Sequence, residues 1–250
     1  MGYVIDFTDA GYGECASQSS IESIQQGLAF KMRFDGDLLN EMSNYEADYW
    51  IEIGDGTASG RKCRIWVYKD QDMSRWQINV KWNQDYYHRN VYVPFGSPLS
   101  SGTYYILYSH YDDSASPDQY EALYESNGTL IDDDSQVMTG GNLPSGSGKG
   151  KVAIAALIGG SDGGSGHWDG LAIYNNVLSG SDRYSEPQNT DTGIVAYWPH
   201  SDGSGSTSTN DVSGGQNLAL SGYTWESGGI WDSGEATPPD PFVTVEIRAP

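Results

Sequence analysis

Two stretches of the chain carry carboxylates and aromatic rings at alternating positions. They are EADYWIE at residues 46–52 and RIWVY at residues 64–68. Successive side chains of a strand point to opposite faces, so a regular first strand would present one polar set, Glu46, Asp48, Trp50 and Glu52. The second strand would present Arg64, Trp66 and Tyr68. If these strands pair, their polar faces form one surface, where rings can stack on sugars and carboxylates can bond hydroxyls.

The same carboxylates raise the alternative of glycoside hydrolysis, which needs two carboxyl groups about 5 Å apart, or below about 10 Å for inversion. In a regular strand Glu46 and Glu52 would lie roughly 20 Å apart, and Asp48 and Glu52 about 13 Å. A hydrolase therefore requires a bulge that compresses this strand. A further alternative is that these carboxylates form a solvated outer face of an acidic protein.

His110 is the remaining candidate catalytic residue. It follows Tyr108 on an aromatic stretch, and the two could form a lyase-type pair with Arg64 or Lys81. None of the four histidines has a local metal-binding spacing, and His167 is expected in a loop beside Trp168.

Runs of aspartate suggest where a cation could bind. Asp112–Asp113 and residues 132–134 fall at the predicted ends of strands, and calcium prefers such oxygen ligands. Neither run has the ordered ligand spacing of a known calcium loop, so solvated turn residues are the favoured interpretation, and calcium stays open as the one candidate cofactor.

The elements that must position these residues are short strands. Alternation and turn residues predict strands over 4–7, 28–34, 47–53, 62–68, 76–82, 91–93, 103–111, 120–125, 152–158, 170–174, 194–198 and 218–220. The second of these places Leu28, Phe30, Met32 and Phe34 on one face. Asn127-Gly128 predicts a tight hairpin turn, and residues 20–27 predict one short helix.

Composition limits the class of protein. With 250 residues, 32 glycines and 18 tyrosines, the chain suits one large all-β domain built from short strands and tight turns. Its net charge of −21 repels phosphate backbones, which excludes nucleic acid as the expected partner. No stretch reaches transmembrane length. The two cysteines, Cys15 and Cys63, are expected to be buried thiols, although one bridge between them is open.

Several segments together resemble a known family. A strand, a glycine-rich hairpin and a strand that ends in IYNNVLS occupy residues 152–179, after the pair GTYYILYSHYDDS and QYEALYESNGTLID. The segment GIVAYWP at residues 193–199 follows them. The order of these segments resembles laminin-G-like domains of the concanavalin A-like superfamily, which implies a jelly-roll β-sandwich and a glycan-binding sheet. In that family the last segment usually opens the domain, so here it either marks a permuted order or completes the same sandwich. Asp169 matches a family aspartate that braces the hairpin or binds a ligand.

The end of the chain is expected to differ from the rest. Residues 1–234 form the predicted sandwich, and residues 235–250 form a proline-rich linker and a strand over 242–248. That strand could pair with its own sheet or with a partner chain, which would make an oligomer. The N-terminal residues lack the features of a secretion signal, so synthesis in a cytoplasm is expected.

The sequence therefore predicts a non-enzymatic recognition or display module. Its expected ligand is a glycan or host-surface polysaccharide, and its expected setting is a virion surface, as in a phage decoration or fibre protein. The alternatives are a polysaccharide-cleaving hydrolase or lyase and a purely structural assembly protein.

Overall fold

A computed structural model describes residues 2–36, 47–83, 87–94, 99, 103–114, 117–137, 141–160 and 166–229. Its strands are β1 (Gly2–Cys15), β2 (Leu28–Asp35), β3 (Ala47–Gly54), β4 (Cys63–Asp70), β5 (Arg75–Trp82), β6 (Tyr87–Pro94), β7 (Tyr104–Tyr111), β8 (Gln119–Glu125), β9 (Leu130–Gln136), β10 (Lys151–Ile154), β11 (Gly166–Tyr174), β12 (Ile194–Trp198), β13 (Thr207–Ser208) and β14 (Leu218–Gly229). The helical turns are α1 (Ser19–Glu22), η1 (Ala58–Gly60) and η2 (Gly180–Arg183).

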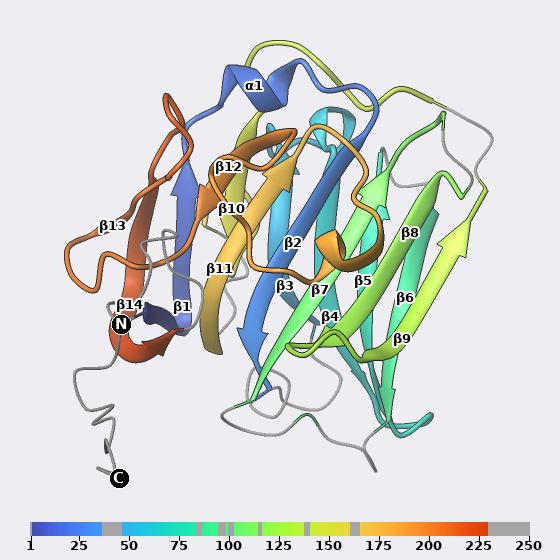
Figure 1. Ribbon diagram of the computed structural model, residues 1–250, viewed down its shortest axis with the longest axis horizontal. Helices are drawn as coiled ribbons and strands as arrows, with labels where there is room; N and C mark the ends of the chain where they lie inside the picture. Colours follow the sequence, from blue (N-terminus) through green and yellow to red (C-terminus); the bar gives the residue numbers. More distant parts are fainter. Residues whose placement is uncertain are drawn as a thin grey trace, which may run out of the picture.

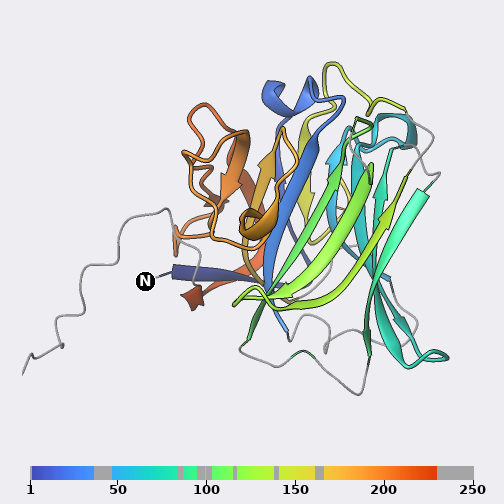
Figure 2. The ribbon, with the colours of Figure 1, turned by 45° about the vertical axis from the view of Figure 1, so that its right-hand side comes forward.

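The strands follow one hydrogen-bonded path that folds over into two layers (Figure 1). The path runs β6-β5-β4-β3-β10-β1-β11-β2-β7-β8-β9, with β12 beside β11 and β14 beside β1. The layer of β11, β2, β7, β8 and β9 lies in front of the layer of β10, β3, β4, β5 and β6 (Figures 1 and 2). The predicted all-β, jelly-roll β-sandwich is confirmed.

The core lies between these layers and is rich in aromatic rings. Leu28, Phe30, Met32 and Phe34 of β2 are fully buried, as their alternation predicts. Phe30 lies 5.8 Å from Trp82 of β5, and Phe34 lies 4.9 Å from Trp50 of β3, measured between ring centroids. The rings of the front layer therefore pack directly against those of the back layer.

The far edges of the two layers meet through aspartates of β9. Asp132 Oδ2 accepts a hydrogen bond from the backbone N–H of Tyr92 at 2.7 Å, and Asp134 Oδ2 accepts from that of Asn90 at 3.5 Å. An edge strand exposes unpaired backbone donors, and these carboxylates satisfy two of them on β6. The acidic run expected at the end of a strand instead lies within β9, which pairs with β8.

Residues 194–220 complete the same sandwich, which settles one of the two orders left open by the sequence. β12 pairs with β11, and β14 pairs with β1 over most of its length. The Asn127-Gly128 turn joins β8 to β9 as predicted, with Gly128 at a φ of 89°. The helix predicted over residues 20–27 is shorter in the structure, where α1 spans four residues. Cys15 and Cys63 are buried free thiols, as expected.

Candidate functional site

A β-bulge in β3 overturns the predicted arrangement of the first candidate stretch. Tyr49 pairs with Trp66 of β4, and Ile51 pairs with Ile65, so Trp50 is the extra residue between them. The bulge directs Trp50 into the core, where it is 1% exposed and packs edge-on against Trp168 at 5.8 Å. The prediction of a ligand-facing Trp50 is therefore wrong, and Tyr49 takes its place on the outer face.

The bulge also separates the carboxylates expected to work together. Asp48 pairs with Val67, whose side chain is in the core, whereas Glu52 pairs with Arg64 on the outer face. Asp48 and Glu52 thus lie on opposite faces of β3. The hydrolase alternative required a bulge that would bring two carboxylates of β3 together. The bulge at Trp50 instead separates Asp48 from Glu52, because one extra residue turns the side chains before it to the other face of the strand. Glu46 lies outside the described residues.

Glu52 is held in place by its neighbours on the outer face. Its side chain is 1% exposed, and its Oε1 accepts from Arg61 Nε at 2.6 Å and from Arg64 Nη2 at 3.2 Å. Its Oε2 accepts from the backbone N–H of Ile158 at 2.8 Å. Glu52 therefore braces the strands rather than facing a ligand, which corrects its predicted role.

The outer side of β3–β6 gathers aromatic and amide side chains in rows across the strands. We call it the β3–β6 face, and its members are Tyr49, Arg64, Trp66, Tyr68, Arg75, Gln77, Asn79, Asn90 and Tyr92. One row joins Tyr49, Trp66, Asn79 and Asn90, and the next joins Tyr68, Gln77 and Tyr92. Asn79 is buried, and the other members keep part of their surface exposed.

Cations on this face lie against its rings. The guanidinium of Arg64 sits 5.1 Å from the centre of the Tyr49 ring, and that of Arg75 sits 3.7 Å from the centre of the Tyr92 ring. Such contacts orient both partners. Of the predicted ligand-binding set, Arg64, Trp66 and Tyr68 are brought together here.

His110 lies on the opposite side of the sandwich, on the outer side of the front layer. As expected it pairs with Tyr108, whose hydroxyl lies 3.0 Å from His110 Nδ1. Arg64 and Lys81 belong to the back layer, and the cation beside this pair is Arg183, 5.4 Å from the centre of the Tyr108 ring. Burial lowers the pKa of His110 to about 4 and raises that of Tyr108. The candidate catalytic residues therefore do not converge within the described part of the chain.

Residues 175–193 form a cover over this outer side of the front layer (Figure 1). Tyr108 Oη accepts a hydrogen bond from Leu178 N at 3.0 Å, which ties the cover to β7. Beneath the cover, Arg33 Nε and Asp169 Oδ2 form an ion pair at 3.1 Å, with both side chains at most 3% exposed. Asp169 thus joins β11 to β2, and the hairpin predicted for residues 152–179 does not form, because β1 lies between β10 and β11.

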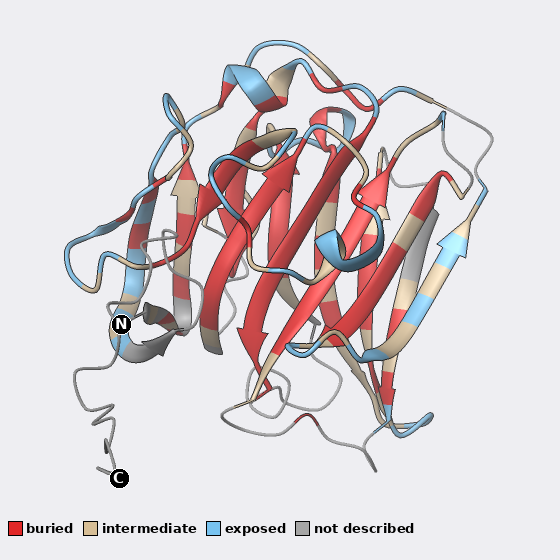
Figure 3. Ribbon diagram, viewed as in Figure 1, coloured by how far each residue is buried: buried red, intermediate tan, exposed pale blue. Residues whose placement is uncertain are grey.

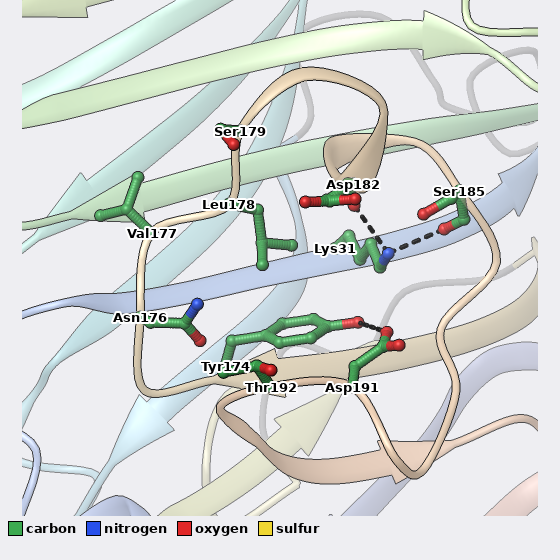
Figure 4. A pocket seen from close by; sticks show the side chains of 10 residues that line it. All are labelled: Lys31, Tyr174, Asn176, Val177, Leu178, Ser179, Asp182, Ser185, Asp191 and Thr192. Carbon is green, nitrogen blue, oxygen red and sulfur yellow. Dashed lines mark hydrogen bonds between the residues drawn. The ribbon is translucent and has the colours of Figure 1, made fainter.

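A polar pocket of about 360 Å³ lies between the cover and the outer side of β2 and β11 (Figure 4). Lys31 Nζ donates to the backbone oxygens of Asp182 and Ser185 at 2.8 and 2.7 Å. The hydroxyl of Tyr174 donates to Asp191 Oδ2 at 3.2 Å on the other wall. Burial lowers the pKa of Lys31 to about 8. This pocket could hold a small polar molecule. Sequence patterns gave no sign of it, because Lys31 and Asp182 on its walls are 151 positions apart in the chain.

Three of the five aspartates considered for calcium accept hydrogen bonds within the protein. Asp112 Oδ1 accepts from the backbone N–H and hydroxyl of Ser114, at 2.9 and 2.7 Å, as in a solvated turn. Asp132 and Asp134 bond to β6. In the described residues, no helix has the length and apolar character needed to cross a membrane. Residues 235–250, including the predicted strand, lie outside the description.

No protein-family profile and no curated protein sequence matches the chain. Among solved structures, the full-length tailspike protein 2 from Escherichia coli O157:H7 bacteriophage CAB120 has a TM-score of 0.46 and 13% identity, covering 75% of this chain and 24% of that one. Domains LG4-5 of the mouse laminin alpha1 chain have a TM-score of 0.44 and 9% identity, covering 70% and 43%. Endo-beta-1,4-glucuronan lyase from the fungus Trichoderma reesei has a TM-score of 0.33 and 8% identity, covering 94% and 84%.

The chain thus spans less than half the length of the tailspike and laminin chains. At these identities the likeness concerns the fold alone.

Proposed function

We propose that this protein is a non-enzymatic module that binds polysaccharide across the β3–β6 face. The observation that carries the proposal is the set of partly exposed rings, Tyr49, Trp66, Tyr68 and Tyr92, interleaved with amides on four neighbouring strands. Aromatic rings offer apolar faces to the C–H side of sugars, and amides donate to and accept from hydroxyls.

The shape of the face supports an extended ligand. Four neighbouring strands span about 14 Å, since adjacent strands lie about 4.8 Å apart. Rings on β3, β4 and β6 are spread over this width instead of lining one hollow. A chain of several sugar units could contact rings on both β3 and β6, whereas a single sugar could not span that width.

The test is affinity electrophoresis against a panel of neutral and uronate polysaccharides, followed by calorimetry on the ones that bind. We expect the Trp66→Ala, Tyr68→Ala double variant to lose at least about 10-fold in affinity, which corresponds to 1.4 kcal/mol. Trp50→Ala is unsuitable because it would open a cavity in the core.

Tyr184→Ala is the matched control, since Tyr184 is a half-exposed ring on the cover of the other layer. It should bind as the wild type does, and thermal melts should show that every variant is folded. Absence of binding to every polysaccharide, or equal binding by the double variant, would refute the proposal. Loss of binding in Asp191→Asn alone would move the site to the Lys31 pocket.

The setting of this activity stays a prediction. Display on a virion surface and pairing of residues 242–248 with a partner chain both concern features outside the described residues. A structural assembly role is the outcome if no glycan binds.

A further inference from the structure

Three metal-ligating side chains meet above β1, away from the β3–β6 face. They are Asp6 of β1, His167 of β11 and Glu226 of β14, and one ligand atom of each lies within 4.8 Å of the others. β11 and β14 pair with the two edges of β1 here, and the three strands lie side by side in Figure 1. His167 is thus a strand residue, and its predicted place in a loop is wrong.

Alternation explains why all three point to the same side. Ile5 and Phe7 are buried in the core, so Asp6 between them faces outward. Trp168 is buried beside His167, and Trp225 packs on the core beside Glu226, so both of these polar residues also face outward. The core residues around each ligand therefore fix its direction.

The strand register then brings the ligands to one point. Asp6 pairs directly with His167, and Glu226 is opposite Val4, diagonal to Asp6. His167 Nε2 lies 3.8 Å from Asp6 Oδ1 and 3.5 Å from Glu226 Oε2. The imidazole and the longer carboxylate side chain thus reach toward each other over β1.

These separations approach those of a metal site. Zinc binds histidine nitrogen and carboxylate oxygen at about 2.1 Å, so two ligands of a tetrahedral ion lie about 3.4 Å apart. The distances from His167 to Glu226 and to Asp6 exceed this value by 0.1 and 0.4 Å. Small side-chain rotations can remove these differences. The hydroxyl of Thr224 lies 3.5 Å from the second oxygen of Asp6 and helps to direct the first one toward His167.

We propose that Asp6, His167 and Glu226 bind one first-row transition-metal ion, for which zinc is the expected choice. An imidazole ligand favours such ions over calcium, which prefers six or more oxygens. Three protein ligands leave a coordination position for water or a ligand oxygen. The ion would join β1 near the start of the chain to β14, so it would also stabilise the fold. The inference does not depend on the proposed glycan binding.

The test is zinc titration of chelator-stripped protein, read by competition with a chromophoric chelator and by thermal melting. We expect one zinc per chain, and a melting temperature about 5–10 °C higher when free zinc is about 100 times its Kd. His167→Gln and Glu226→Gln should each weaken binding at least 10-fold and abolish the thermal shift. Asp133→Asn removes one exposed carboxylate from β9 and is the matched control, with unchanged binding.

A second measurement on the wild type keeps the test decisive if a variant misfolds. Co²⁺ should broaden the amide NMR signals of residues 5–7, 167 and 224–226 before those of β4. Zinc binding retained in a folded His167→Gln variant, no binding by the wild type at millimolar zinc, or broadening centred elsewhere would each overturn the proposal. Displacement of zinc by equimolar calcium would also overturn it.

Discussion

The outer sides of the two layers carry the same kinds of side chain, tyrosines alternating with arginine or lysine, yet only one is left open. On the β3–β6 face, Arg64 and Arg75 lie against half-exposed rings. On the front layer the cover buries Lys31 and Arg33 to 1% and 3% exposure. The same pattern of tyrosines and cations therefore forms an exposed surface on one layer and a buried polar region beneath the cover on the other.

This difference leads us to expect that the buried charges contribute more to stability than the exposed ones. Under the cover, each cation needs a specific partner because burial removes its water. Lys31 has two backbone oxygens, and Arg33 has Asp169. Near the open face, solvent reaches the pair of Arg75 and Asp70, whose side chains are 26% and 13% exposed, so these side chains can change with less effect on folding.

The sharpest test of the contrast is the buried ion pair. Asp169→Asn leaves the Arg33 guanidinium buried beside a neutral amide, and we expect it to lower the free energy of unfolding by about 3–5 kcal/mol. Urea denaturation measures the loss. The Arg33→Met, Asp169→Leu double variant removes both charges and should recover part of it. A loss below 1 kcal/mol would mean that the cover opens readily to water.

A second test concerns the contact between the cover and the β8–β9 hairpin. Gly128 has a φ of 89°, and a Cβ added there would lie 2.5 Å from Cε2 of Tyr184. We expect Gly128→Ala to cost about 2–4 kcal/mol, the sum of backbone strain and displacement of the cover. Gly146→Ala is the control, since that glycine has a φ of 111° and no neighbour within 4 Å of the added atom. Equal losses in the two variants would show that Tyr184 moves aside freely.

The hydroxyl of Tyr108 offers a third test. Tyr108→Phe removes the acceptor of the Leu178 N–H and the group beside His110 Nδ1, both buried. We expect a loss of about 1–3 kcal/mol in unfolding free energy. Tyr92→Phe removes a hydroxyl that accepts from Asn90 at 3.2 Å on the open face, and it should cost less than about 1 kcal/mol. Comparable losses would contradict the contrast between the faces.

The pH dependence of stability reports on Lys31. Burial lowers its pKa to about 8 from an ordinary value of 10.5. Between these values the unfolded chain binds more protons than the folded one, so stability rises with pH in this window. Lys62, whose pKa is lowered to about 8 by burial, acts in the same direction. We expect Lys31→Met to reduce the rise between pH 8 and pH 9.5 by about 1–2 kcal/mol, measured by urea denaturation, whereas Lys81→Met should leave it unchanged.

The smallest expected effect comes from the ion pair near the open face. Asp70 Oδ2 lies 3.7 Å from Arg75 Nε, with side chains 13% and 26% exposed. Asp70→Asn keeps the hydrogen-bonding shape and should change the unfolding free energy by less than about 1 kcal/mol, with added salt making little difference. A loss as large as that of Asp169→Asn would remove the distinction between the two faces.

The sequence by itself determined the all-β sandwich, the core face of β2 and the hairpin at Asn127-Gly128. These follow from local rules, because alternation and turn residues act over a few neighbouring positions. It also placed Arg64, Trp66 and Tyr68 together, since β4 is regular and its two faces differ clearly in polarity. The sequence could not show which side of the front layer would be covered.

Only the tertiary structure decided the position of Trp50, the cover and the cluster of Asp6, His167 and Glu226. A single bulge in β3 reversed the faces that regular alternation assigned, and a bulge depends on how neighbouring strands pair. Asp6 and His167 are 161 positions apart and His167 and Glu226 are 59 apart, so no local spacing reveals the cluster. Contacts between distant strands are set by register and packing, which is why these features appear only when the chain is folded.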